Sequence, residues 1–263
     1  MCTTGAIIFC EDEYVLFKNK DFAKKHFKDN LVVEANLWGA SGTETFAEED
    51  ITKEVFSGLS IGANSHGLLC CDSHVNYEPL GAANYDKLVE VALRQAKDVD
   101  SALGALKVHL FDNPSWAGNL VLTDGIKTAR VEVRGNELQV HEDLHCVVST
   151  NHQFLFDSDN PCASVSSTER LSSAGKRLAS ASSIEDVFTL LSSHDRGNTG
   201  VCNHQIELKT VYSYMLHYKA GVQTLYVTNE QPCETAQYQK LVLPIGSEWS
   251  EAAATVFEES YPN

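Results

Sequence analysis

The chain has little positive charge and no long hydrophobic run. Its 20 lysines and arginines stand against 36 aspartates and glutamates, so the formal net charge is -16 at pH 7. A surface of that sign repels phosphate backbones and anionic membranes, and we expect neither nucleic acid nor a membrane as a partner. No segment approaches the roughly 18 consecutive apolar residues that a membrane-spanning helix needs.

A secretory leader is also missing from the first residues. The segment 1–7 has no basic region and no apolar run before a cleavage site, which indicates a cytoplasmic protein. The eight cysteines form no C-x-x-C pair, and in that compartment they are expected to stay reduced. Cys70 and Cys71 are adjacent, and neighbours on a strand point to opposite faces, so they do not predict a shared metal. We expect no metal site and no cofactor.

Hydrophobic residues make up 43% of the 263 residues, enough for a sizeable core, and the sequence predicts one domain over residues 1–263. Period-two patterns predict strands at 4–10, 14–17, 119–123, 128–134, 137–140, 145–150, 212–218 and 224–227, with two more within 55–71. Period-3.6 patterns predict helices at 85–96, 101–106, after 166, behind a capping box at 183–186, and at 251–259. Strands grouped into hairpins, with helices between the groups, favour antiparallel sheets with helices in separate layers, an α+β protein.

Cys2 is the residue with the most chemical information. A small residue at position 2 normally allows removal of the initiator methionine, which leaves a cysteine with a thiol and a free α-amine. An α-amine typically has a pKa of about 7.7–8.0 and a thiol one of about 8.5, so the amine can act as the base for its own side chain. Nucleophile and base then belong to one residue. A cysteine at this position by itself has little specificity.

Further segments resemble choloylglycine hydrolases and the isopenicillin-N acyltransferase-like proteins, more closely the latter. In these families a nucleophilic cysteine begins a strand, and a basic-Asn-x-Asp motif follows about 16 residues later. The matching segments are Cys2-Thr3-Thr4, Lys18-Asn19-Lys20-Asp21, Gly62-Ala63-Asn64-Ser65-His66-Gly67-Leu68, Ser149-Thr150-Asn151-His152, Ser166-Ser167-Thr168-Glu169-Arg170 and Cys202-Asn203-His204 with Thr210-Val211. Each segment alone is weak evidence, but together the segments follow the family's order from residue 2 to about residue 240.

The resemblance implies a role for each matched residue. Cys2 attacks an amide carbonyl, and Lys18 provides a nearby cation that favours the thiolate. Asp21 lies across the hairpin and holds or orients the α-amine. The side chain of Asn151 donates to the oxyanion, and Asn64 assists or positions the substrate. Arg170 pairs with Asp21 or with the region of the nucleophile, although Asn64 could also be an ordinary turn residue and Arg170 a structural ion pair.

The same resemblance implies a four-layer αββα sandwich of antiparallel sheets, the fold of N-terminal-nucleophile hydrolases. The implied reaction is cleavage of a non-peptide C–N amide bond in a small N-acyl substrate through a thioester on Cys2. Transfer of the acyl group to an amine is the alternative reaction, and a thiol-rich binding or redox protein is the non-enzyme alternative. Position 18 is Lys where bile-salt enzymes have Arg, so a bidentate contact is not expected there. Homo-oligomerisation is left open.

Overall fold

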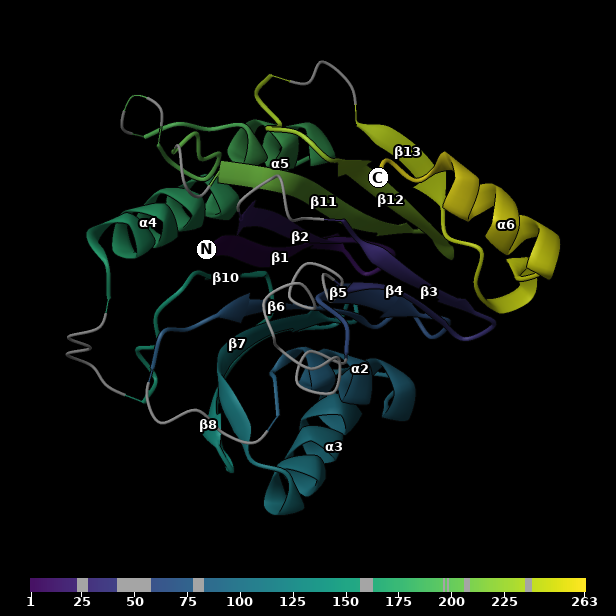
Figure 1. Cartoon of the computed structure of the whole chain (residues 1–263), viewed down its shortest axis with the longest axis horizontal. Coiled ribbons are helices and arrows are strands. Elements are labelled where there is room, and N and C mark those ends of the chain that lie inside the picture. The colour runs from purple at the N-terminus through teal and green to yellow at the C-terminus, as the bar shows by residue number, and fades with distance from the viewer. Residues whose placement is uncertain are drawn as a thin grey trace.

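The computed structural model describes residues 1–22, 28–41, 58–77, 83–156, 163–195, 197, 199–205, 209–234 and 238–263. Residues 55–57, part of a predicted strand pair, and Cys162 lie outside these ranges. Two antiparallel sheets stack face to face, with helices on both outer sides (Figure 1).

The first sheet has six strands in the order β10-β1-β2-β11-β12-β13. Its members are β1 (Cys2–Cys10), β2 (Glu13–Phe22), β10 (Cys146–Ser149), β11 (Lys209–Lys219), β12 (Val222–Thr228) and β13 (Gln239–Val242). The predicted N-terminal hairpin forms its centre. Gly5 is required there, because a Cβ at this position would lie 2.4 Å from the Phe17 ring on the paired strand. The strand that begins at Cys2 is therefore held between β10 and β2.

The second sheet has seven strands in sequence order from β3 to β9. Its members are β3 (Asn30–Glu34), β4 (Leu37–Ser41), β5 (Ile61–Asn64), β6 (Leu69–His74), β7 (Ser115–Thr123), β8 (Thr128–Gly135) and β9 (Glu137–Asp143). The sequence did not predict β3, β4 or β13. All five residues of β4 are buried and show no alternation, whereas β3 and β13 are short edge strands with exposed residues.

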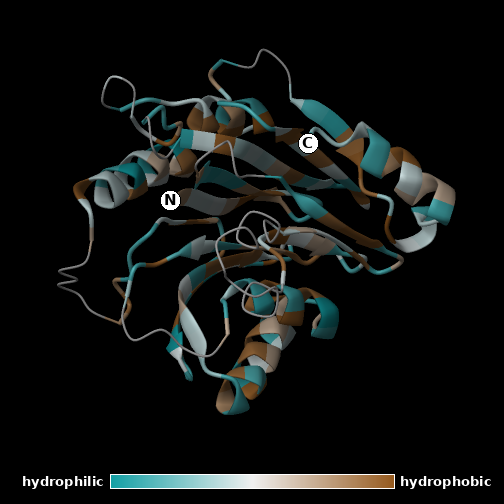
Figure 2. Ribbon diagram, in the orientation of Figure 1, coloured by the Kyte–Doolittle hydropathy of each residue, from teal (hydrophilic) through white to brown (hydrophobic). Residues whose placement is uncertain are grey.

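Three hydrophobic clusters separate the four layers. One lies between the sheets and includes Leu16, Val121 and Tyr214. A second joins the outer face of the seven-stranded sheet to α2 (Asp86–Gln95) and α3 (Val99–Asp112). A third joins the outer face of the six-stranded sheet to α4 (Val165–Ala179) and α5 (Ile184–Leu191). In Figure 2 hydrophobic segments run along the stacked strands. The predicted αββα sandwich is confirmed.

Local signals explain where several helices begin and end. The predicted capping box at Ser183 and Asp186 is present at the start of α5, and a second box, Asp98 with Ser101, starts α3. The predicted short helix at 101–106 is thus too short, because α3 extends to Asp112. A short 3-10 turn (Gly246–Glu248) precedes α6 (Glu251–Ser260), and from this helix Phe257 enters the core between the sheets. Among the described residues no helix is long and apolar enough to cross a membrane.

Candidate active site

The pairing of β1 with β2 sets which side chains share a face with Cys2. Cys2 lies opposite Lys20, and Thr4 lies opposite Lys18. Residues directly opposite each other on paired strands point to the same side of the sheet, so both lysines share the face of Cys2. Asn19 points the other way, toward the helices, where its Nδ2 donates to two backbone carbonyls.

A β-bulge in β1 decides this arrangement. The pairs Cys10–Glu13 and Ile8–Tyr14 leave Phe9 as an extra residue, so all later pairs shift by one. Without the shift Cys2 would lie opposite Asp21, as the sequence analysis expected. The correction is therefore that the direct partner of Cys2 is Lys20, while Asp21 pairs with Met1 through two backbone hydrogen bonds of 2.7 and 2.9 Å.

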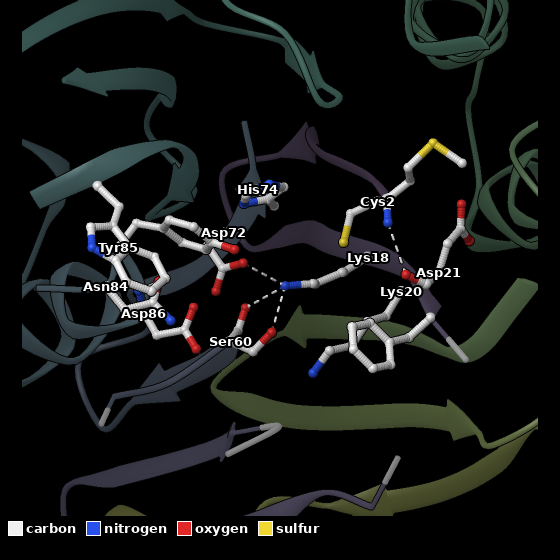
Figure 3. A pocket seen from close by; sticks show the side chains of 13 residues that line it. Cys2, Lys18, Lys20, Asp21, Ser60, Asp72, His74, Asn84, Tyr85 and Asp86 are labelled. Atoms are coloured by element: carbon white, nitrogen blue, oxygen red, sulfur yellow. Dashed lines mark hydrogen bonds and ion pairs between the residues drawn. The ribbon is translucent and has the colours of Figure 1, made fainter. Parts of the chain in front are cut away.

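Cys2 lines a cavity of about 240 Å³ (Figure 3). The cavity is bounded by β1, β2, β6 and the start of α2. It is lined by Met1, Cys2, Lys18, Lys20, Asp21, Phe22, Ser60, Asp72, His74, Asn84, Tyr85, Asp86 and Trp116. Ligand sites for drug-sized molecules usually measure about 300–1,000 Å³, so the part of a ligand enclosed here is small. Three of the predicted site residues, Cys2, Lys18 and Asp21, are among the lining residues.

Lys18 is fully buried and is held by three hydrogen bonds. Its Nζ donates to the Ser60 carbonyl at 3.0 Å, to Ser60 Oγ at 2.6 Å and to Asp72 Oδ1 at 2.9 Å (Figure 3). Burial lowers the pKa of Lys18, but the negative charge of Asp72 and the hydrogen bond to it outweigh burial, and the pKa of Lys18 lies above the ordinary value. Lys18 is thus a fixed cation beside Cys2. Neither Ser60 nor Asp72 was identified from the sequence.

Two buried carboxyl groups face each other on the far side of this cation. Burial and the charge of Asp72 raise the pKa of Asp86 well above its ordinary value. The charged form of Asp86 is therefore disfavoured. Burial also lowers the pKa of Lys20, although Asp29, 3.8 Å away, opposes this. One wall of the cavity thus holds lysines and carboxyl groups in contact.

Arg170 and Asn151 hold the backbone of Cys2. Arg170 is 2% exposed, and its guanidinium donates to the Cys2 carbonyl, to Thr3 Oγ1 at 2.8 Å and to Asn151 Oδ1 at 2.8 Å. The same Asn151 oxygen accepts from the backbone nitrogen of Cys2 at 2.9 Å. Asn151 Nδ2 donates one hydrogen bond to the His74 carbonyl at 2.8 Å. The structure therefore brings both predicted residues to Cys2.

Asp21 follows Lys20 on β2, so its side chain points to the other face of the sheet from Lys18 and Lys20. Its Oδ1 accepts from Thr210 Oγ1 at 2.8 Å, and its Oδ2 is buried with no hydrogen-bond partner among the described residues. Burial raises the pKa of Asp21, and the N-terminal ammonium, Arg170 and Thr210 oppose it. A buried acceptor beside the chain terminus is suited to hold an amine.

The structure does not bring Asn64 to the cavity. Its Nδ2 donates to the carbonyls of Leu93 and Ala96 at the end of α2, at 2.9 and 2.7 Å. Its Oδ1 accepts from the backbone nitrogens of His66 and Leu68. The side chain is thus occupied in joining the turn after β5 to the end of α2, the ordinary structural role that the sequence analysis kept as an alternative.

His74 is a cavity residue that the sequence analysis did not identify. It ends β6, the strand that also carries Asp72. Burial and the nearby N-terminal charge lower the pKa of His74, so the ring is neutral near pH 7. A neutral imidazole can donate one hydrogen bond and accept another. Its place could have been sought from alternation along β6, because Asp72 and His74 point to the same face.

Solved structures share the fold at low sequence identity. A variant of conjugated bile acid hydrolase from Clostridium perfringens has a TM-score of 0.61 and 14% identity, with 92% of each chain covered. Penicillin V acylase from Agrobacterium tumefaciens has a TM-score of 0.51 and 14% identity, with 91% of each chain covered. The Caenorhabditis elegans ortholog of N-acylethanolamine-hydrolyzing acid amidase has a TM-score of 0.54 and 11% identity, over 92% of this chain and 100% of the other.

No curated protein sequence matches the chain. A family model does: the one described as acyl-coenzyme A:6-aminopenicillanic acid acyl-transferase matches residues 9–232. This range is most of the chain, and the shared fold agrees with the resemblance to N-terminal-nucleophile hydrolases read from the sequence. The chain belongs to the acyl-coenzyme A:6-aminopenicillanic acid acyl-transferase family.

Proposed function

We propose that this protein cleaves the C–N amide bond of a small N-acyl compound through a thioester on Cys2. The observation that carries the proposal is the position of Cys2. It lies at a small cavity, beside the fixed cation Lys18, and its backbone is held by Asn151 and Arg170. The family match begins at residue 9, so the role of Cys2 rests on this geometry. The names of the structural neighbours, a bile acid hydrolase and an acid amidase, support an amide substrate.

The mechanism begins with cleavage of the Met1–Cys2 peptide bond, which frees the α-amine of Cys2. The amine takes the proton from Sγ, and the thiolate attacks the amide carbonyl. Asn151 Oδ1, which accepts from the Cys2 nitrogen at 2.9 Å, keeps the amine oriented. The buried Oδ2 of Asp21 can accept a further proton of the amine.

The tetrahedral intermediate has a negative oxygen that needs donors. An amide NH₂ group has two protons, and Asn151 Nδ2 gives one to the His74 carbonyl. Its second proton is the proposed oxyanion donor, with neutral His74 beside it. The ammonium of Cys2 then protonates the leaving nitrogen, the C–N bond breaks, and an acyl thioester remains on Sγ. Water, deprotonated by the same amine, attacks the thioester and releases the acid and the free thiol.

The decisive experiment compares the native protein with Cys2→Ala and with Cys10→Ser. Cys10 is exposed and lies at the other end of β1, so it is a matched thiol control. A set of N-acyl amines and N-acyl amino acids is incubated with each protein, and the intact mass is recorded. We expect an acyl adduct and released amine with the native protein and with Cys10→Ser, and neither with folded Cys2→Ala. Turnover by Cys2→Ala, or a native protein that turns over with Met1 still attached, refutes the mechanism.

Acyl transfer is the second candidate, and the name of the matching family favours it. The thioester is then attacked by an amine instead of water. The two reactions differ in how the acyl group is divided between a new amide and the free acid. When an acceptor amine is added at rising concentration, a transferase forms new amide at the expense of free acid, whereas a hydrolase keeps releasing acid.

A further inference from the structure

Four metal-binding side chains meet at a place away from the cavity. His194, Cys202 and His204 lie in the segment between α5 and β11, and Cys233 lies in the connection from β12 to β13. One donor atom from each residue lies within 4.8 Å of those of the other three. None of the four lines the Cys2 cavity. From this convergence we propose that the protein binds one structural zinc ion through two cysteines and two histidines.

The distances fit a tetrahedral site. Cys202 Sγ lies 3.4 Å from Cys233 Sγ and 3.6 Å from His204 Nε2. With Zn–S of about 2.3 Å and Zn–N of about 2.0–2.1 Å, donor atoms of a tetrahedral site lie about 3.3–3.8 Å apart. The contact of His204 Nε2 with Cys233 Sγ, 2.9 Å, is shorter and would lengthen when an ion enters. The His194 and His204 rings have centroids 5.0 Å apart, and a ring nitrogen of His194 lies within 4.8 Å of the other three donor atoms, which makes it the fourth ligand.

The donor set selects the metal. Two thiolates with two imidazoles in a tetrahedral arrangement are typical of zinc, and four protein ligands leave no open position for substrate. Binding displaces one proton from each thiol, and the two thiolate charges balance those of Zn²⁺. His204 has the usual support for a ligand, since its Nδ1 lies 3.4 Å from Glu234 Oε1 while Nε2 faces the sulfurs. Cys202 is buried, whereas His194 and Cys233 are exposed, which leaves an entry path for the ion.

A disulfide between the two cysteines would account for only half of this cluster. It would give no role to the two histidines. A reactive Cys233–His204 pair would likewise leave Cys202 and His194 unexplained. The metal site is the one arrangement that uses all four side chains.

The site is connected to Asp21 by a short chain of hydrogen bonds. Asn203 lies between two ligands, and its backbone nitrogen donates to Thr210 Oγ1 at 2.9 Å. Thr210 Oγ1 in turn donates to Asp21 Oδ1 at 2.8 Å. The carbonyl of Val201, one residue before Cys202, accepts from Asn19 of β2. The ion would thus fix the segment that holds Asp21 against the start of β1, and it acts as a positioning element.

The test measures metal in the full chain, purified without chelator and without a metal-affinity column. We expect about one zinc per chain by elemental analysis. Cobalt(II) added to the chelator-treated protein should give thiolate-to-cobalt charge transfer and the intense visible bands of a tetrahedral site. Cys233→Ser and His194→Gln, both at exposed positions, should fold and lose at least nine tenths of the metal. Their matched controls, Cys10→Ser and His141→Gln, should keep it.

Several results would overturn the proposal. One is a folded native protein that takes up no zinc from an equimolar solution under reducing conditions. Another is equal metal content in Cys233→Ser and Cys10→Ser. A third is an intact mass lower by two hydrogens that chelators leave unchanged and a reductant restores, with peptide mapping that places the disulfide between Cys202 and Cys233. The proposal is independent of the reaction proposed above, since Cys2→Ala should bind zinc as the native protein does.

Discussion

The buried pair of Lys18 and Asp72 gives the sharpest prediction about this site. The two side chains are 1% and 4% exposed, and their charged atoms are 2.9 Å apart. Removing one partner of such a pair leaves an uncompensated buried charge, which typically costs about 3–5 kcal/mol. Lys18→Met and Asp72→Asn should therefore each lower the free energy of unfolding by about this amount. Asp72→Asn should also lower the pKa of Lys18, because the charge that opposes the effect of burial is gone.

The double variant separates a charge effect from a packing effect. Lys18→Met with Asp72→Asn removes both charges of the pair. Replacing a whole buried ion pair by uncharged groups is often close to neutral, so the double variant should be more stable than either single variant. Activity should fall in all three, because the cation beside Cys2 is weakened or absent.

The assay is urea unfolding followed by circular dichroism at one pH, with turnover measured in parallel. Lys87→Met is the matched control, because Lys87 forms a pair with Glu90 in which its side chain is 38% exposed. This substitution should cost no more than about 1 kcal/mol. If the two single costs simply add in the double variant, the pair is not coupled and the reasoning fails.

Three further outcomes are expected. Asn64→Ala should lower the free energy of unfolding by about 1–3 kcal/mol, because the Leu93 and Ala96 carbonyls lose their hydrogen-bond donor. A large fall in kcat at unchanged stability would instead support a catalytic role for Asn64. Asn151→Ala should reduce kcat about 10²–10³-fold if Nδ2 is the oxyanion donor, and a fall in stability alone would contradict this. Asp86→Asn should change the pH dependence of stability. The pKa of Asp86 is raised in the folded protein, so its stabilising contribution is complete below the unfolded pKa of about 3.9 and is lost as the pH rises. The variant resembles the protonated acid, so its free energy of unfolding should rise relative to that of the native protein between about pH 4 and 7 in pH-resolved urea titrations. Parallel curves would refute the raised pKa of Asp86.

Local patterns predicted the parts of the fold that depend on local chemistry. The N-terminal hairpin, the capping box at Ser183 and the strand β11 follow from short-range sequence signals, and all are present. The exact partner of Cys2 did not follow, since the one-residue bulge at Phe9 has no signature in a continuous apolar run. Edge strands such as β13 were not predicted for a related reason, because their mostly exposed residues show little alternation of polar and apolar side chains.

The site was predictable only where a family motif pointed to it. Cys2, Asp21, Asn151 and Arg170 meet because strands far apart in sequence pair, and only their order along the chain hinted at this. Lys18 was found as a cation, but its partners come from other strands or loops.

The zinc-ligand cluster shows the same limit. Cys202 and His204 are close in sequence, but Cys233 reaches them only through the pairing of β12 with its neighbours. A loop contact of this kind leaves no periodic trace in the sequence.

The bulge at Phe9 makes the length of the hairpin a determinant of chemistry. With the bulge in place, deleting one residue of β1 between Cys2 and Ile8 would bring Asn19 and Asp21, instead of Lys18 and Lys20, to the face of Cys2. A one-residue insertion in β2 between Tyr14 and Lys18 would do the same. Additions in the exposed turn at Glu11 and Asp12 would leave both faces unchanged. In alignments of relatives, gaps should therefore be tolerated at that turn and absent between it and the lysines.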